Sequence, residues 1–312
     1  MKRRVLALLM AAAMTVGMMG CGAVAIDGEG ESKETSSSES TGSGSVGLAI
    51  TTLNNPFFVK LSEGAQAAAD EAGVKLITVD AGDDAAKQTS DVEDLISKNV
   101  SVLIVNPVDS DAIAPAVKDA VAKGLKVISV DRVVNGVDVD CQIASDNVAG
   151  AEMATEYLAE LVGDGAKVAE LQGVPGASAT IDRGEGFHNV ADEKLDVVLS
   201  QTANFNRAEG MTVMENILQS ASDVKGVFAH NDEMALGALE AVAGKDIQIV
   251  GFDATDDAVA AVKDGKMAAT VAQQPDKMGE TAVNTAISLI NGESVEKSIP
   301  VEVTLITKEN AE

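Results

Sequence analysis

From Val46 onward the chain alternates short β-branched runs with longer alanine-rich amphipathic segments. Nearly continuous apolar strands separated by helices are typical of a parallel sheet that helices cover on both faces. Glycines mark the helix ends, as in the segment "EAGVKL", where a left-handed residue stops the helix before the next strand. The alternation therefore predicts an α/β fold of doubly wound parallel sheets. The expected strands lie at 46–52, 74–80, 100–107, 125–132, 141–146, 166–173, 196–202, 225–232, 247–253 and 268–274.

Ten strand units are more than one hydrophobic core holds comfortably, so the same pattern predicts two lobes of similar size. We expect the first crossover between the lobes at residues 145–147, after the fifth strand. Neither charge nor composition changes at that point, so only the strand pattern indicates it.

The N-terminus has the features of an export signal. Residues 1–20 begin with three basic residues and continue with a short apolar run, which is too short for a good membrane-spanning helix. Gly20 directly before Cys21 resembles the lipobox of bacterial lipoproteins, in which Cys21 would carry the lipid, although Met18 replaces the usual leucine. The alternative is an ordinary signal peptide with a cysteine nearby.

Residues 21–45 follow the expected cleavage point and consist mainly of Gly, Ser, Glu and Thr. Such a stretch cannot bury enough apolar surface to offset its ordering entropy, so we expect a disordered tether behind a lipidated Cys21. A tether of this kind would hold the folded domain close to a membrane surface.

Charge and cysteine content exclude two classes of protein. Cleavage before Cys21 would remove three basic and no acidic residues, taking the formal charge from −26 to −29. A nucleic-acid partner is excluded because phosphate binding needs a basic stripe, and the sequence shows none. The remaining cysteine, Cys141, has no intramolecular partner, so we expect it to be buried and free rather than part of a disulfide framework.

Polar residues gather where the expected strands end. In an open parallel sheet, ligands bind beyond the carboxyl ends of the strands. Two lobes that face each other would bring these ends together around one cleft. The residues concerned are Thr51, Asn54, Asn55, Asn106, Asp109, Asp131, Arg132, Gln172, 204–207, Asn231, Asp232, Asp253 and Gln273.

The chain lacks the usual signatures of catalysis. It has two histidines, no serine or cysteine in a nucleophile-elbow sequence, and no metal-ligand spacing. The acidic segment 253–258 lacks the alternating pattern and central glycine of a calcium loop. We therefore expect a binding protein with no catalytic residue, no metal and no cofactor.

A small neutral polyol fits the strand-end residues well. Sugar hydroxyls both donate and accept hydrogen bonds, and Asp, Asn, Gln and Arg side chains supply both functions. The adjacent Asp131 and Arg132 could present an acceptor and a forked donor to a sugar, or could form only a local ion pair.

Aromatic residues gather at the same ends. The C–H faces of a sugar ring pack on flat aromatic rings. Phe57, Phe58, Phe205 and Phe252 adjoin strand ends, although Phe57 and Phe58 could instead simply seat the first helix. The remaining phenylalanines occupy core positions, Phe187 on a helix and Phe228 in a strand.

Eight motifs follow one another along the chain, namely "TTLNNPFF", "NPVDSDA", "VDR", "IASDN", "RGEGF", "HNDEMALGAL", "VGFDAT" and "VAQQPDKMG". Together they resemble the type I periplasmic sugar-binding proteins, and most closely their ribose-binding members. The resemblance spans residues 46–307 and implies two doubly wound lobes joined by a three-crossing hinge. It places the N-terminal lobe at 46–145 plus 274–300 and the C-terminal lobe at 146–273 plus 301–312.

The resemblance also implies a set of ligand-binding residues, carried over position by position. Thr51 stands where the family has a serine, and we expect Thr51 and Phe252 to support the site from behind. The expected ligand-binding residues are Asn55, Phe57, Phe58, Asp131, Arg132, Arg183, Phe205, Asn231, Asp253 and Gln273.

These expectations describe a monomeric sugar-binding lipoprotein on the outer face of a bacterial membrane. It would capture ribose or a close pentose by hinge closure and deliver it to an ABC permease. An alternative is a sensory module that presents a sugar-like signal to a receptor. A sugar-responsive transcriptional regulator is excluded because an export signal stands where a DNA-binding helix-turn-helix would be.

Overall fold

The computed structural model describes residues 44–311, which belong to one compact unit. The expected signal peptide, the lipidation of Cys21 and the tether up to residue 43 lie outside the described residues. The first strand begins at Ser45, so the fold starts within the last residues assigned to the tether. Between residues 44 and 311, no helix is long and apolar enough to cross a lipid bilayer.

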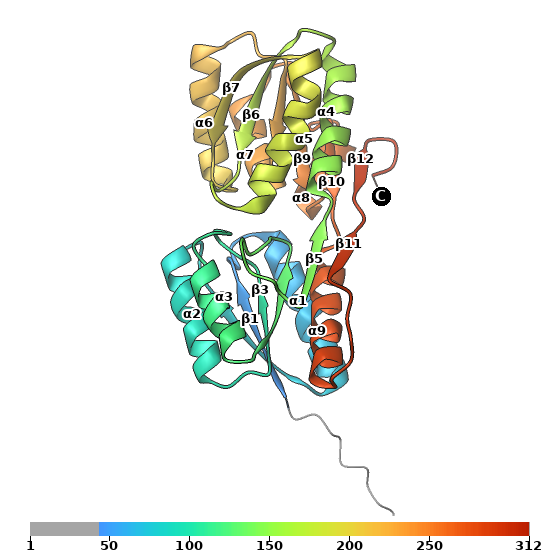
Figure 1. The fold of residues 1–312 in the computed structure, drawn as a ribbon. Coiled ribbons are helices and arrows are strands. Elements are labelled where there is room, and N and C mark those ends of the chain that lie inside the picture. The colour runs from blue at the N-terminus through green and yellow to red at the C-terminus, as the bar shows by residue number, and fades with distance from the viewer. Residues whose placement is uncertain (1–43, 312) are drawn as a thin grey trace, which may run out of the picture. The chain divides into compact units, whose positions relative to one another are not determined.

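The first lobe is built on a six-stranded sheet in the order β11-β5-β4-β3-β1-β2, with every neighbouring pair parallel. Helices α1 and α9 cover one face, and α2 and α3 cover the other (Figure 1). The strands are β1 (Ser45–Ile50), β2 (Lys75–Asp80), β3 (Val102–Val105), β4 (Lys126–Val130), β5 (Cys141–Ser145) and β11 (Ser298–Val301), and the helices are α1 (Pro56–Ala72), α2 (Ala85–Ser97), α3 (Ala114–Ala122) and α9 (Pro275–Ile290).

The second lobe repeats this plan with the order β12-β10-β9-β8-β6-β7, in which only β12 is antiparallel to its neighbour. Helices α4 and α5 pack on one face, and α6, α7 and α8 on the other. The strands are β6 (Lys167–Gln172), β7 (Asp196–Thr202), β8 (Gly226–Ala229), β9 (Gln248–Asp253), β10 (Ala269–Ala272) and β12 (Thr304–Thr307), and the helices are α4 (Asn147–Val162), α5 (Ser178–Lys194), α6 (Arg207–Ser220), α7 (Asp232–Ala241) and α8 (Asp256–Lys263).

The α/β fold with two doubly wound sheets is confirmed. The chain passes between the sheets three times, after β5, after β10 and between β11 and β12 (Figure 1). The sequence pattern did not predict β11 and β12. Both are only four residues long, and β11 contains Pro300, which lowers its strand signal.

Buried side chains of the two sheets follow the expected pattern. Leu48 and Ala49 in β1 alternate between the two cores that flank the first sheet. Cys141 is buried and free, as expected. Phe187 and Phe228 stack in the core of the second lobe, with ring centroids 5.2 Å apart and planes 4° apart. The core therefore contains the two phenylalanines assigned to it from the sequence.

Helices α1 and α9 pack so closely that a side chain would not fit at Gly279. A Cβ atom at this position would lie 2.0 Å from the carbonyl oxygen of Leu61 in α1. We expect Gly279→Ala to lower the free energy of unfolding by about 2–3 kcal/mol, because backbone must move to admit the methyl group. Urea denaturation measures this.

Gly184→Ala in α5 is the matched control. A Cβ atom there would meet its nearest neighbours at 3.6 Å, an ordinary contact. Gly184→Ala should leave the free energy of unfolding within about 0.5 kcal/mol of the parent value, or raise it slightly through better helix propensity. An equal loss in both variants would contradict the close crossing of α1 and α9.

Candidate functional site

The carboxyl ends of both sheets meet at a polar pocket. Its cavity is about 20 Å³, within about 250 Å³ of empty space that includes the open mouth. Nine of the ten expected ligand-binding residues line it. One lining residue, Ala179, was missed, because one alanine among many carries no sequence signal. The lining residues are Asn55, Phe57, Phe58, Asp131, Arg132, Ala179, Arg183, Phe205, Asn231 and Asp253.

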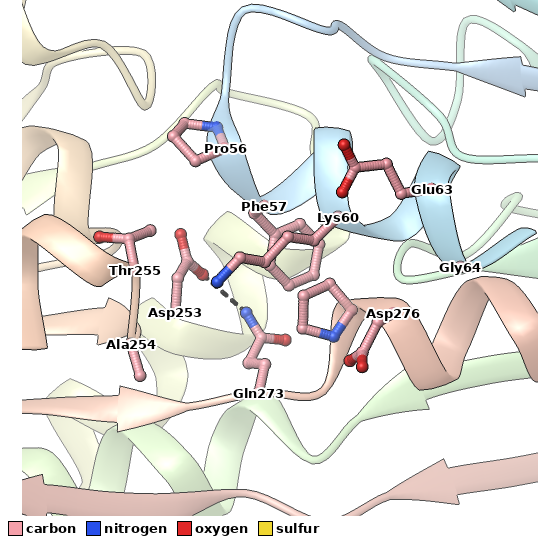
Figure 2. Close-up of a pocket in the computed structure, with 11 residues that line it drawn as sticks. Pro56, Phe57, Lys60, Glu63, Gly64, Asp253, Ala254, Thr255, Gln273 and Asp276 are labelled. Carbon is pink, nitrogen blue, oxygen red and sulfur yellow. Dashed lines mark hydrogen bonds between the residues drawn. The ribbon is translucent and has the colours of Figure 1, made fainter. Parts of the chain in front are cut away.

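The tenth expected residue, Gln273, lies in an adjoining hollow that shares Phe57 and Asp253 with the pocket (Figure 2). Its Nε2 donates a hydrogen bond to the Oδ1 of Asp253 at 2.7 Å. Gln273 therefore fixes the Asp253 carboxylate from the hinge side, and its direct contact with a ligand stays a prediction.

The start of helix α1 aims two aromatic rings at the pocket. Asn55 is the N-cap of α1, and its Oδ1 accepts a hydrogen bond from the N–H of Phe57 at 2.9 Å. Pro56 opens the helix with a φ that suits the first turn. Phe57 and Phe58 meet edge to face, with centroids 5.2 Å apart. Both rings pack in the core beneath the helix and also line the pocket, so contact between these rings and a ligand stays a prediction.

Arg132 lies between two aromatic rings from opposite lobes. Its guanidinium carbon is 5.2 Å from the ring centre of Phe58 and 5.2 Å from that of Phe205. Its NH1 donates to the carbonyl oxygen of Pro107 at 2.9 Å. The Nε atom is 3.5 Å from the Oδ2 of Asp131. The local ion pair is therefore long, and it forms part of the pocket wall.

Arg183 is held by the second lobe in a comparable way. Its Nε donates to the Oδ1 of Asn147 at 2.8 Å, and its NH1 donates to the carbonyl oxygen of His230 at 2.5 Å. The guanidinium lies 3.8 Å from the ring centre of the fully buried Phe252. Phe252 is absent from the pocket lining and supports Arg183 from behind.

Asn106 supports Asp131 from inside the first lobe. Its Nδ2 donates to the Oδ2 of Asp131 at 3.1 Å, and its Oδ1 accepts from the N–H of Thr51 at 3.2 Å. Its carbonyl oxygen accepts from the Thr51 hydroxyl at 2.9 Å and from the Nε2 of Gln88 at 2.8 Å. Thr51 therefore lies outside the pocket lining and is bonded to the residue that supports Asp131. Gln88 gave no signal in the sequence because it lies within a helix.

The pocket combines two carboxylates with two guanidinium groups in a nearly dry setting. Asp131, Arg132, Arg183 and Asp253 are all at most 7% exposed. Burial raises the pKa of Asp131 and Asp253 and lowers the pKa of both arginines, and the opposite charges work against each of these shifts. The charges balance, so the pocket favours a neutral ligand with many hydroxyl groups.

Three lining residues have left-handed backbone conformations. The φ angles are 63° at Asp131, 58° at Phe205 and 124° at Asp253. Such conformations cost about 1–3 kcal/mol each in residues other than glycine and often occur at functional sites. In each case the unusual backbone belongs to a residue that lines the pocket.

Asp232 carries a buried carboxylate beneath this wall of the pocket. Its Oδ2 accepts from the N–H and the hydroxyl of Thr255 at 2.7 and 3.1 Å, and its Oδ1 accepts from the hydroxyl of Thr270 at 2.6 Å. Burial, the largest cause, raises the pKa of Asp232 to about 7. The sequence placed Asp232 at a strand end but gave it no role.

This carboxylate should make the fold more stable in acid. The folded protein holds the proton up to about pH 7, whereas the unfolded chain releases it near pH 3.8. Stability should therefore fall by a few kcal/mol as the pH rises from about 4 to 7. Asp232→Asn keeps an acceptor for Thr255 and can donate to the Thr270 hydroxyl, so it should flatten this dependence. Thermal unfolding at pH 4, 5, 6 and 7 measures the slope.

Asp246→Asn, at an exposed aspartate of the same lobe, is the control. It should leave the dependence on pH unchanged. A slope in Asp232→Asn that equals the parent slope would show that another group titrates.

Glu170 and His230 form a second buried pair in this lobe. Both side chains are fully buried, and the Oε1 of Glu170 lies 2.8 Å from the Nε2 of His230. Since the carbonyl oxygen of His230 accepts from Arg183, this pair stabilises the residue that holds the guanidinium. Across residues 44–311, no group of three or more His, Cys, Asp or Glu side chains could hold a metal ion.

Sequence comparison assigns the chain to a family. The model of the periplasmic binding protein domain matches residues 46–294, which is most of the chain. The chain belongs to the periplasmic binding protein family. The ribose import binding protein RbsB of Bacillus subtilis (strain 168) is 53% identical over 266 residues, covering 85% of this chain and 87% of that protein.

A second relative and a solved structure are also similar to this chain. The RbsB protein of Escherichia coli (strain K12) is 48% identical over 269 residues, covering 85% of this chain and 91% of that protein. The solved structure of the Caulobacter myo-inositol binding protein, with myo-inositol bound, is 36% identical and superposes with a TM-score of 0.82. That match covers 86% of this chain and 94% of the solved chain. These three relatives are named as binding proteins, two for ribose import and one for myo-inositol.

Proposed function

We propose that this protein binds one molecule of D-ribose, or a close pentose, in the pocket between its lobes. The observation that carries the proposal is the convergence of nine expected ligand residues on one buried pocket. Phenylalanine rings offer faces for the C–H surface of a sugar, and the paired charges offer donors and acceptors for its hydroxyls. Relatives 48–53% identical to this chain bear the name of ribose import binding proteins, which favours ribose.

Two of the pocket amides already use their oxygen atoms within the protein, which limits the hydrogen bonds they can make to a sugar. Asn55 and Asn231 each use their Oδ1 atoms to cap a helix, accepting from the N–H groups of Phe57 and Met234. Their Nδ2 groups are left as donors, although one N–H of Asn231 Nδ2 already donates to the carbonyl oxygen of Phe205 at 3.4 Å, which leaves its second N–H for a ligand. These amides therefore act as donors to the sugar, while Asp131 and Asp253 supply acceptors.

Entry of the sugar requires the lobes to separate. The charged residues of the pocket are nearly inaccessible in this arrangement. A sugar that contacts both lobes would stabilise the closed arrangement over an open one. In the proposed sequence of events, the open protein captures the sugar, closes over it and delivers it to an ABC permease.

A thermal-shift panel tests the choice of sugar. D-ribose should raise the melting temperature more than D-arabinose, D-xylose, D-allose or myo-inositol at the same concentration, because the ligand with the lowest Kd stabilises the folded protein most. A ligand at a thousandfold excess over its Kd adds about 4 kcal/mol of stability. The myo-inositol arm matters because a solved relative binds that ligand. A larger shift with another ligand would replace ribose with that ligand, and no shift with any of them would overturn the proposal.

The proposed location is the outer face of a bacterial membrane, anchored through a lipid on Cys21. This part of the proposal rests on the sequence of residues 1–45 and on membership of a periplasmic binding protein family. Mass spectrometry of the protein from its native membrane should find acyl groups on an N-terminal Cys21. A mature N-terminus elsewhere, without lipid, would overturn the anchor and leave sugar binding intact.

A further inference from the structure

Beyond the pocket lining, two serines accept hydrogen bonds from the opposite lobe. Ser110 follows β3 in the first lobe, and Ser178 is the first residue of α5 in the second. The N–H of Ser178 donates to the Oγ of Ser110 at 3.2 Å, and the N–H of Val133 donates to the Oγ of Ser178 at 3.0 Å. The N–H of Ser110 also donates to the carbonyl oxygen of Gly176 at 3.0 Å. All three bonds join one lobe to the other.

Helix α5 obtains part of its N-terminal cap from the opposite lobe. A helix usually satisfies its first N–H groups with the side chain of its own N-cap residue. The N-cap of α5 is Ala177, which makes no side-chain cap bond. The hydroxyl of Ser110 accepts from the N–H of Ser178 instead. Separation of the lobes would remove this partner and leave that N–H to water.

The lobes approach to backbone contact at this point. Ser110 is fully buried and Ser178 is 7% exposed. Gly176 has a φ of 88°, and a Cβ atom there would lie 2.2 Å from the Oδ2 of Asp109 in the first lobe. The contact is therefore closely packed, and its hydrogen bonds depend on the closed arrangement.

The same contact joins the two segments that carry the arginines of the pocket. Val133 directly follows Arg132, and Ser178 directly precedes the lining residue Ala179. Arg183 lies further along α5, the helix that Ser178 begins. Formation of the serine contact therefore brings both arginine-bearing segments to the pocket together.

We propose that Ser110 and Ser178 form a clasp that stabilises the closed lobes and so sets the affinity and residence time of the sugar. The inference rests on the proposed function, because it assigns affinity to two residues outside the pocket lining. Interactions present only in the closed arrangement shift the balance between open and closed protein. When most of the sugar-free protein is open, a contact that raises the closed fraction by some factor lowers the Kd of a sugar that binds the closed arrangement by that factor.

Single substitutions test the clasp. Ser110→Ala removes the acceptor for the N–H of Ser178, and Ser178→Ala removes the acceptor for the N–H of Val133. Each leaves an N–H at the contact between the lobes without its partner only when the lobes close, so each should raise the Kd for ribose about tenfold. The increase should appear mainly as faster dissociation in stopped-flow experiments. The double variant should lose less than the product of the two factors, because both bonds belong to one contact.

Ser129→Ala is the matched control. Ser129 is a fully buried serine of β4 in the first lobe, and within residues 44–311 its hydroxyl has no hydrogen-bond partner. Ser129→Ala removes a serine hydroxyl, as the clasp substitutions do, but breaks no bond to the other lobe. The Kd should therefore stay within about twofold of the parent. Clasp variants that match this control would overturn the proposal.

A measurement without sugar separates the clasp from the identity of the ligand. Spin labels at Asp119→Cys on α3 and Glu215→Cys on α6, in protein that also carries Cys21→Ser, report the distance between the lobes, and Cys141 is buried away from the reagent. Electron–electron double resonance on sugar-free protein should show a larger share of long distances in Ser110→Ala than in the parent.

An unchanged distance distribution in Ser110→Ala would overturn the clasp even if ribose binds. Conversely, a parent protein that binds no sugar would overturn the proposed function, while a shifted distribution would still support the clasp.

Discussion

Arg183→Ala should weaken ribose binding by a factor of about 100 or more. Arg183 faces the pocket from α5, and its removal leaves the buried Asp253 carboxylate without the guanidinium 3.7 Å away. Breaking a buried charge pair on one side costs about 3–5 kcal/mol, chiefly because the remaining charge is unpaired. Isothermal titration calorimetry with D-ribose measures the loss, and circular dichroism checks that the variant is folded.

Two further variants make this test specific. Arg183→Lys keeps the positive charge but loses the fork that bonds to Asn147 and to the carbonyl oxygen of His230, so its affinity should lie between parent and alanine variant. Arg207→Ala removes a partly exposed arginine that pairs with Glu233 outside the pocket, and it should change the Kd by less than about threefold. Equal affinities in Arg183→Ala and Arg207→Ala would contradict the assigned site.

Gly173→Ala should lower ribose affinity about 30- to 100-fold without touching any polar group of the pocket. A Cβ atom at residue 173, just after β6, would lie 2.0 Å from the Cζ of Phe205. The ring must then leave its position, where it also faces the guanidinium groups of Arg132 and Arg183 at 5.2 and 6.0 Å. Displacement of a ring in a packed site costs about 2–3 kcal/mol.

The control for Gly173→Ala is the same substitution at Gly184, which has room for a methyl group. Gly184→Ala should bind ribose within about twofold of the parent. Phe205→Ala should resemble Gly173→Ala, and the double variant should be no worse than either, because both changes remove one ring from the pocket. Parental affinity in Gly173→Ala would show that Phe205 does not contact the sugar.

The sequence predicted the parts of the site that depend on position along a strand. Asp131 and Asp253 could be predicted because each ends a strand, and a parallel sheet gathers such ends at one edge. The aromatic residues Phe57, Phe58 and Phe205 were recognisable because the chain contains so few rings. These residues line one pocket in the structure.

Contacts that depend on tertiary packing could not be predicted. Gln88 holds the network from a helix, and nothing in its local sequence distinguishes it from a surface amide. Asn147 ends the motif "IASDN", but that motif did not indicate its bond to Arg183. Ser110 and Ser178 meet only because two lobes close, so no local pattern pairs them. The short strands β11 and β12 form for a similar reason, since each completes a sheet that the rest of the chain has built.

A crystal structure of the mature domain grown with D-ribose tests the proposed binding site. It should contain one ribose between the lobes, with Phe57, Phe58 and Phe205 against its C–H surface and Asp131, Arg132, Arg183 and Asp253 bonded to its hydroxyls. Saturating ribose with no sugar density in this pocket, or a ribose bound elsewhere on the protein, would contradict the proposed site.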